Sequence, residues 1–404
     1  MVMTLVVFAM VLLSSSGGGV SESPSMPATM AIGGQVVETP SPPVMPETKL
    51  SVETSESVHR DTEAAGSCSK VTTPMWSPEA FLDAAGGHLM FCSQFGDVPI
   101  SEPELRPRII YGAMFNFEAD MLEVAMHQVY PIVDRFYVVE SSITHSTKTK
   151  VLEWPEHSTE ERFLPFRDKV KHLVFEPKKT MKSGWDVEKQ QRVTYIEEMI
   201  NGKQNGLNLT FNDIVMANMD LDEIPSRTML MRFKYCKMAR GTKLFYRIFH
   251  FRYHLGCLQT LKVDDLFNTM FFWPAENLHT QKAIKKEIYK RREHRVRREI
   301  SSTANLTAEF QHPYTTWHMS AFGGMKAIMR KHDHSPHRFV GDFPRKEVER
   351  AIKNCEYNDQ KMFRVNVENI FLDPPAQKGQ PDRLPYLIQR NMCYYKQQGW
   401  FGTV

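Results

Sequence analysis

Two aspartates separated by one residue follow a short apolar run in the middle of the chain. The run covers residues 213–217, and Asp220 and Asp222 come just beyond its carboxyl end. Two carboxylates at this spacing can together bind a hard cation such as Mn²⁺ or Mg²⁺, which in turn holds the diphosphate of a nucleotide-sugar. As a Lewis acid, the cation neutralises the charge that grows on the leaving phosphate. The pattern therefore predicts a metal-dependent donor site at Asp220 and Asp222.

The position of this pattern matters more than its composition. An Asp-x-Asp tripeptide arises by chance roughly once in a chain of this length. In open α/β sheets, however, ligands bind beyond the carboxyl ends of the strands, which is where Asp220 and Asp222 are expected to lie. The next residue, Glu223, is expected to support the metal ligands or to cap a helix that begins near Pro225.

The surrounding hydrophobic pattern predicts the elements that would position these carboxylates. Short apolar runs alternate with amphipathic segments, which is typical of an α/β domain with a mostly parallel central sheet. The predicted strands are residues 109–115, 136–139, 172–175 and 213–217, and the predicted helices are residues 119–129, 158–166 and 186–200. Beyond residue 244 the alternation is less regular, and residues 245–249 and 269–273 are expected to form antiparallel strands.

The composition divides the 404-residue chain into three parts. Residues 1–16 contain an apolar run and a small-residue boundary, so they are expected to be a signal peptide or a short signal-anchor, with a mis-assigned start as the alternative. Residues 17–104, rich in Ser, Pro and Thr at their beginning, are expected to be a largely disordered stem. Residues 105–404 are expected to form the catalytic domain.

Charge, cysteines and sequons indicate the cellular setting. The net charge of +3 is small and dispersed, so no nucleic-acid partner is expected. Asn208 and Asn305 lie in glycosylation sequons, as a protein of the secretory pathway would allow. The six cysteines are even in number, but in a chain of this size buried thiols are expected more often than a disulfide framework.

Several ordered motifs resemble those of glycosyltransferase family 17. They occupy residues 115–123, 133–141, 184–185 with Arg192, 219–225, 317–320 and 384–387. The resemblance implies a nucleotide-sugar-binding fold of the GT-A type and an inverting transfer of N-acetylglucosamine from UDP-N-acetylglucosamine. The implied acceptor is a β-mannose of a glycoprotein N-glycan core, joined in β-1,4 linkage. It also implies a place in the secretory pathway, in the Golgi lumen or at its membrane, with membrane attachment through the N-terminal apolar segment.

The motifs also contain the expected site residues. The residues expected at the metal and in catalysis are Asp220, Asp222 and His318, and those expected to bind the nucleotide-sugar are Asn116, Glu118, Glu140, Ser141, Trp185, Arg192, Asp220 and Trp317. Each has a structural alternative: helix capping for the polar residues after the first two strands, a stack beneath the sheet for Trp185 and Arg192, and a core histidine for His318.

Three questions stay open at this level. An inverting transfer needs a carboxylate base on the acceptor side, and Asp342 and Glu309 are the candidates. Asn218-Met219 and Thr316 stand where the family often has an acidic residue and a glycine, so the donor sugar and acceptor could differ. The two competing hypotheses are a transferase with another donor sugar or a polysaccharide acceptor, and a catalytically silent glycan-binding protein on the same fold.

Overall fold

The structure is a computed structural model, and it describes residues 68–177, 183–201, 213–237, 248–258, 272–274, 316–334, 345–357, 360–364 and 384–402. All of them belong to one compact unit, Ala65–Val404. Several predictions lie outside the described residues: the signal segment 1–16, the sequons at Asn208 and Asn305, and the base candidates Asp342 and Glu309.

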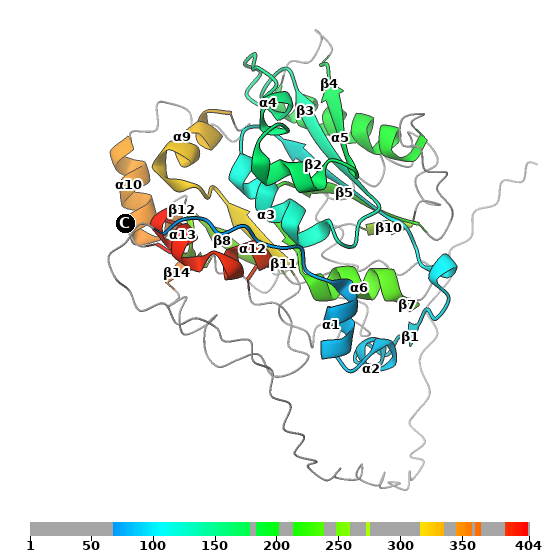
Figure 1. The fold of residues 1–404 in the computed structure, drawn as a ribbon. Helices are drawn as coiled ribbons and strands as arrows, with labels where there is room; N and C mark the ends of the chain where they lie inside the picture. Colours follow the sequence, from blue (N-terminus) through cyan, green and yellow to red (C-terminus); the bar gives the residue numbers. More distant parts are fainter. Residues whose placement is uncertain are drawn as a thin grey trace, which may run out of the picture. The chain divides into compact units, whose positions relative to one another are not determined.

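A five-stranded sheet with the order β10-β5-β2-β3-β4 forms the centre of this unit (Figure 1). Four of its strands are parallel, namely β2 (Ile109–Phe115), β3 (Arg135–Ser141), β4 (Val170–Phe175) and β5 (Ile214–Asp220). The short edge strand β10 (Phe272–Pro274) is antiparallel to β5. The predicted α/β class with a mostly parallel sheet is therefore confirmed.

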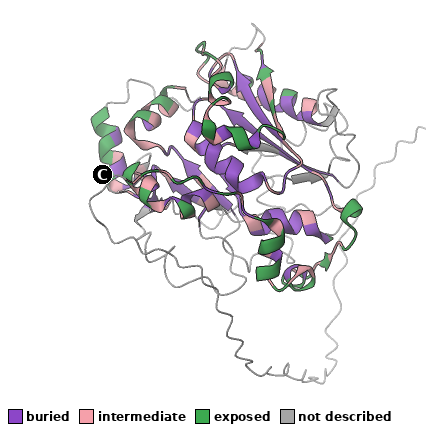
Figure 2. Cartoon of the chain, in the orientation of Figure 1, coloured by how far each residue is buried: buried purple, intermediate pink, exposed green. Residues whose placement is uncertain are grey.

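Helices cover both faces of this sheet because alternate residues of each strand point to opposite sides. On β2, Ile109 and Tyr111 pack in the same cluster as helix α3 (Ala119–Val129), whereas Ile110 and Met114 pack with helix α5 (Gly184–Asn201). Figure 2 shows that β2, β3 and α3 are almost entirely buried, whereas β4 is partly exposed. Both helices match the predicted segments.

Gly112 allows α5 to lie close to β2. A Cβ atom at Gly112 would lie 2.7 Å from Met199 Sδ and 3.3 Å from Tyr195 Cε2. The glycine therefore sets how closely the helix approaches the central strand.

The strand order contains a reversal that defines a ligand crevice. The chain runs from β2 outward through β3 to β4 and then returns to place β5 on the other side of β2. Connections that leave two neighbouring strands in opposite directions open a crevice beyond their carboxyl ends. The residues that follow β2 and β5 are therefore at the position where a ligand is expected.

A second five-stranded sheet has the order β14-β9-β8-β11-β6, and its strand β6 begins three residues after the end of β5. Its strands are β6 (Glu223–Pro225), β8 (Ile248–Arg252), β9 (His254–Leu258), β11 (Thr316–Ser320) and β14 (Phe363–Arg364). The pairing is mixed, since β11 is parallel to β8 but antiparallel to β6. The antiparallel pairing predicted for this half holds for β8 with β9 and for β10 with β5. Residues 221–222 form the turn that connects the two sheets.

The other elements surround these sheets. They are α4 (Trp154–His157), the 3-10 helix η2 (Glu161–Phe166), α6 (Arg227–Tyr235), α9 (Gly324–His334), α10 (Arg345–Asn354), β12 (Glu356–Tyr357), β13 (Gln360–Lys361), α12 (Tyr386–Arg390) and α13 (Met392–Gln397). Of the helix predicted at residues 158–166, only the 3-10 helix η2 is present, and α4 ends before that range. Pro165 lies inside η2 and cannot donate a backbone hydrogen bond there.

The end of the predicted stem is part of the compact unit. Residues 68–104 contain α1 (Pro78–Ala84), α2 (His88–Ser93) and β1 (Val98–Pro99), with η1 (Pro103–Leu105) at the boundary, and β1 pairs with β7 (Cys236–Lys237). Trp76, Leu82 and Phe91 are at most 5% exposed and belong to the main core. The unit therefore begins near residue 65 instead of 105, because these large apolar side chains are buried against it.

The cysteines correct a second expectation. Three disulfides join Cys68 to Cys393, Cys92 to Cys236 and Cys257 to Cys355, so no free cysteine is left. Two of them attach residues 68–104 to the catalytic unit. The sequence-based expectation of buried thiols is therefore wrong. Disulfides persist mainly in oxidising compartments.

No helix in the described part of the chain is both long and apolar enough to cross a membrane. The apolar segment at residues 1–13, which carried the expectation of membrane attachment, lies outside that part.

Candidate active site

The turn from Asp220 to Glu223 is fixed by the strands around it. The backbone carbonyl of Asp222 accepts a 2.8 Å hydrogen bond from Met319 N in β11, and Glu223 Oε2 accepts one of 3.2 Å from Asp220 N. Tyr111 Oη on β2 donates to the Glu223 carbonyl at 3.4 Å. The side chain of Glu223 thus stabilises the turn, while Ser226 caps α6 through Met229 N.

Asp222 lies at the centre of the site and is 3% exposed. Its Oδ2 atom accepts a hydrogen bond of 2.6 Å from Lys331 Nζ on α9, and its Oδ1 atom lies 3.5 Å from His318 Nε2 on β11. Burial by itself would raise the pKa of Asp222, but the charges of Lys331 and His318 outweigh it and hold the pKa far below its usual value. Asp222 is therefore an anion at every physiological pH.

Lys331 also brings Glu118 into the site. Its Nζ atom donates to Glu118 Oε1 at 2.7 Å, so one ammonium bridges the carboxylates that follow β2 and β5. Burial lowers the pKa of Lys331, but Asp222 and Glu118 reverse this effect and raise it above the ordinary value. The crevice inferred from the strand order is thus lined by charged residues from both of its strands.

Two histidines stack beside these carboxylates. His318 and His250 are register partners on β11 and β8, and their rings lie 4.1 Å apart at an angle of 8°. Burial together with the neighbouring His318 lowers the pKa of His250 to about 2, whereas Asp222 overcomes burial and raises the pKa of His318. His318 Nδ1 and His250 Nε2 are buried and have no hydrogen-bond partner among the described residues.

Arg192 on α5 positions Asp220, the second residue of the predicted metal pair. Its Nη2 atom pairs with Asp220 Oδ1, and its Nε atom donates to Glu188 Oε1 at 3.2 Å. Arg192 is 5% exposed in its side chain, whereas Asp220 is 41% exposed. The guanidinium is therefore buried beneath a carboxylate that is open to solvent, which suits a carboxylate that receives a ligand from that side.

The charges and residue types at this site suit a divalent cation, although among the described residues only His254, Cys257 and Cys355 have ligand atoms that all lie within 4.8 Å of one another. Five carboxylates lie within this turn and its ion pairs, against the fixed positive charges of Arg192 and Lys331. They are those of Glu118, Glu188, Asp220, Asp222 and Glu223. Carboxylate oxygens together with an imidazole are a ligand set that suits Mn²⁺. Asp222, Asp220 and His318 are the residues that would hold such a cation, which would neutralise charge on a departing phosphate.

Glu140 and Ser141, also expected at the donor, organise the loop after β3. Glu140 is 0% exposed and accepts hydrogen bonds from Lys150 Nζ (2.7 Å) and Glu153 N (2.6 Å). Lys150 Nζ also donates to the Asn116 carbonyl at 2.9 Å, which links the loops after β2 and β3. Ser141 Oγ accepts from Ile143 N. These contacts build the rim of the crevice on the side of β3.

The two tryptophans are placed differently. Trp317 is fully buried in β11, where it pairs with Ile224 and Phe249 on the neighbouring strands and precedes His318. Trp185 is half-buried in the first turn of α5. Thus the structure brings together Glu118, Arg192, Asp220, Asp222 and His318, while Trp317 supports the strand that carries His318.

Replacing Glu140 by alanine is expected to lower the free energy of unfolding at pH 7 by about 3 kcal/mol, because it leaves the buried Lys150 ammonium without its anion. Burial opposes ionisation of Glu140, but hydrogen bonds from His172, Lys150 and Glu153 N outweigh it and hold its pKa below the ordinary 4.5. Since the folded-state pKa is depressed, this stabilisation is present above pH 4.5 and is lost as the pH falls through the folded-state pKa.

Denaturant titrations at pH 7 and in acid check this expectation, with exposed Glu104→Ala as the control expected to change little. A stability difference between wild type and Glu140→Ala that stays constant into acid would contradict it.

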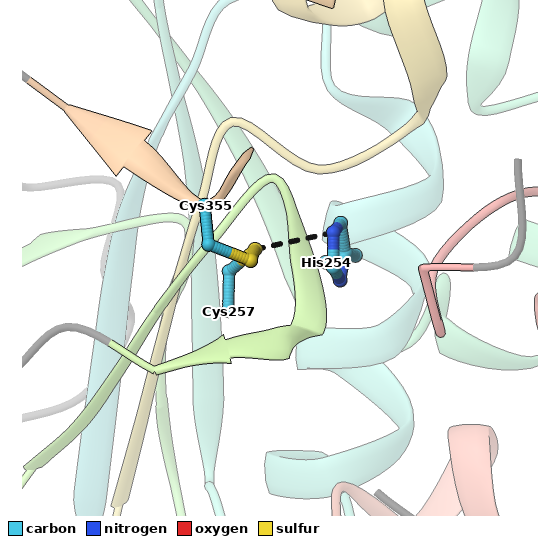
Figure 3. Close-up of side chains that lie close together, drawn as sticks. All are labelled: His254, Cys257 and Cys355. Carbon is cyan, nitrogen blue, oxygen red and sulfur yellow. Dashed lines mark hydrogen bonds between the residues drawn. A yellow bond between two sulfur atoms is a disulfide. The ribbon is translucent and has the colours of Figure 1, made fainter. Parts of the chain in front are cut away.

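A separate group of potential ligand atoms is formed by His254 and Cys257 on β9 with Cys355, which follows α10 (Figure 3). His254 Nε2 lies 3.1 Å from Cys257 Sγ, and Cys257 is joined to Cys355 by a disulfide. His254 Nδ1 accepts a hydrogen bond of 3.1 Å from Gly256 N, and both ring nitrogens therefore face groups of the protein. Disulfide sulfurs are not thiolates and do not bind a metal, so this cluster is a structural contact in the oxidised protein.

Sequence reasoning missed Lys331 and His250. Lys331 lies 109 residues from Asp222 and 213 from Glu118, in a helix with several other basic residues, so no local pattern distinguishes it. His250 is brought to His318 by a parallel pairing between strands that lie far apart in the sequence, β8 and β11. The one available signal is that successive side chains of β8 point to opposite faces of the sheet, which could have indicated that His250 faces inward.

Comparison with known proteins gives this arrangement a class. Residues 84–260 match the family model described as Glycosyltransferase family 17. The segment includes Glu118, Arg192, Asp220, Asp222 and His250, and it ends before His318 and Lys331. The resemblance to this family that the motifs indicated is thus confirmed over residues 84–260.

The chain is also similar to three curated relatives, each named β-1,4-mannosyl-glycoprotein 4-β-N-acetylglucosaminyltransferase. The protein of Rattus norvegicus is 29% identical over 140 residues, which cover 33% of this chain and 25% of the relative. Those of Homo sapiens and Mus musculus are 28% identical over 140 residues, covering 33% of this chain and 26% and 25% of the relatives. The chain therefore matches about a quarter of the length of these relatives.

Proposed function

We propose that the chain is an inverting, metal-dependent glycosyltransferase that moves N-acetylglucosamine from UDP-N-acetylglucosamine to a β-mannose of an N-glycan core in β-1,4 linkage. The observation that carries the proposal is the group of carboxylates beyond β2 and β5, where Glu118, Asp220 and Asp222 line the crevice of an α/β sheet. The family match supports a glycosyltransferase, and the relatives' names are the support for the proposed sugar, acceptor and linkage.

In this proposal the residues of the crevice have distinct roles. Asp222 and Asp220 hold Mn²⁺ or Mg²⁺ together with His318, and Arg192 fixes the orientation of Asp220. The loops after β2 and β3, which contain Asn116, Glu140 and Ser141, form the rim against which the nucleotide is expected to bind, with Trp185 at the start of α5. The acceptor hydroxyl still needs a base, and Asp342 and Glu309 stay candidates for that role.

The proposed place is the secretory pathway, in the Golgi. Three disulfides in one compact unit support an oxidising compartment. The proposed partners are a nucleotide-sugar donor and a glycoprotein N-glycan acceptor.

A donor screen tests the proposal. The purified full chain is incubated with single UDP-sugars in Mn²⁺ or in a chelator, and released UDP is measured. UDP-N-acetylglucosamine in Mn²⁺ is expected to give the fastest release, and the chelator is expected to stop it. Preference for another UDP-sugar would favour a transferase with a different donor, and glycan binding without UDP release would favour a silent glycan-binding protein.

A further inference from the structure

Helix α9 is attached to the rim of the crevice by several contacts. Arg330 pairs with Glu153 and lies 4.6 Å from the centre of the Phe117 ring, and Ser146 Oγ donates to the Asp333 carbonyl at 3.0 Å. The helix follows β11 after a tight turn, in which Gly323 has a φ of +102°. Lys331 and His318 therefore reach Asp222 from one continuous strand-turn-helix segment.

Lys331 places its positive charge between two of the carboxylates. Its Nζ atom lies 2.6 Å from Asp222 Oδ2 and 2.7 Å from Glu118 Oε1. The side chain of Asp222 is 4% exposed, that of Glu118 18% and that of Lys331 29%, so this contact is sheltered from screening by solvent. An Asp222 carboxylate that binds this ammonium has less capacity for a divalent cation, since both use the same negative charge.

The balance of charge indicates when Lys331 would release Asp222. A metal ion that arrives alone must separate the ammonium from Asp222 and offers it no new anion. A metal ion that arrives with a nucleoside diphosphate brings phosphate oxygens, which bind a lysine ammonium well. The favourable interaction that the Lys331 ammonium loses at Asp222 is then replaced by an interaction with the diphosphate.

We propose that Lys331 couples metal binding to donor binding: its ammonium holds Asp222 in the free protein and moves to the donor's diphosphate when the metal and the nucleotide bind together. The proposal rests on the proposed function. Lys331 is a positioning residue for the donor site in this account, and its effect is a coupling free energy between two ligands. Such couplings are reciprocal, so UDP strengthens metal binding by the same factor by which the metal strengthens UDP binding.

The test measures Mn²⁺ affinity of the full chain, with and without UDP, by the electron paramagnetic resonance signal of free Mn²⁺. In wild type, UDP is expected to strengthen Mn²⁺ binding roughly 5- to 150-fold, the usual range of such couplings. Lys331→Met is expected to bind Mn²⁺ alone about tenfold more tightly and to lose most of the UDP effect. Lys331→Arg keeps the charge and is expected to resemble wild type, and exposed Lys326→Met on the same helix is the matched control.

The outcomes separate this inference from the proposed function. Unchanged or weaker Mn²⁺ binding in Lys331→Met, with a native thermal transition and a UDP effect equal to that of wild type, overturns the role of Lys331 and leaves the proposed function standing. Absence of Mn²⁺ binding in every variant, with and without UDP, overturns both. If Lys331→Met does not fold, a Lys331→Arg protein whose Mn²⁺ binding has lost its dependence on UDP overturns the coupling.

Discussion

Asp222→Asn is expected to lower metal-dependent release of UDP from the donor by about 10²- to 10³-fold, the usual effect of removing one electrostatic contact to a developing charge. Asparagine keeps the shape of the side chain and removes only the charge. Asp222 is 3% exposed and is the point where Lys331, His318 and the turn between the two sheets meet. Its carboxylate is therefore the group whose charge the site depends on most.

Asp213→Asn is the matched control for this substitution. Asp213 lies before the other end of β5 and pairs with Arg108 Nη2 at 2.6 Å, far along the strand from the crevice. The control is expected to lose stability but to keep the turnover of the folded protein. Full turnover in Asp222→Asn, measured as UDP release at saturating donor and Mn²⁺, would remove Asp222 from the metal site.

Removing the disulfide between Cys92 and Cys236, by replacing both residues with serine, is expected to lower the free energy of unfolding by about 4 kcal/mol. The bond closes a loop of 144 residues, and in the chain-entropy model a long loop restricts the unfolded chain strongly. The substitution also places two hydroxyls in a site where both cysteines are at most 2% exposed. Denaturant unfolding in non-reducing buffer measures the loss.

The same variant tests whether residues 68–104 depend on that bond. Helix α2 is expected to become sensitive to a protease before the central sheet does, because the disulfide joins it to β7. Ser93→Ala, at the exposed end of α2, is the control and is expected to change stability by less than about 0.5 kcal/mol. A double variant as stable and as protease-resistant as the control would contradict this account.

The parallel sheet could be predicted from the sequence because its signal is local. Four apolar runs, each followed by a helix or a turn, place β2 to β5, and the two aspartates after the last run lie where the strand order opens a crevice. Glu118, which follows the first strand, was expected at the donor for the same reason, whereas Arg192 was expected there from the family motifs. The family motifs added His318, which a hydrophobic pattern alone cannot distinguish from a core histidine.

The features that the sequence did not predict depend on pairings between residues that are distant in the sequence. The parallel pairing of β8 with β11, the contact of Lys331 with Asp222 and the three disulfides each join segments that lie far apart in the sequence. The number of alternative pairings is large, and tertiary packing selects among them. Residues 68–104 were misassigned because the polar composition before them suggested one continuous stem, although a few large apolar side chains bind this segment to the core.

The most direct test of the proposed activity is transfer to defined glycans. The full chain is incubated with UDP-N-acetylglucosamine, Mn²⁺ and a panel of N-glycans with and without the core β-mannose, and the mass and linkage of the products are determined. The account predicts one added N-acetylglucosamine, β-1,4-linked to that mannose, and no product with Asp222→Asn. A product on glycans that lack the mannose, or wild-type yield from Asp222→Asn, would contradict it.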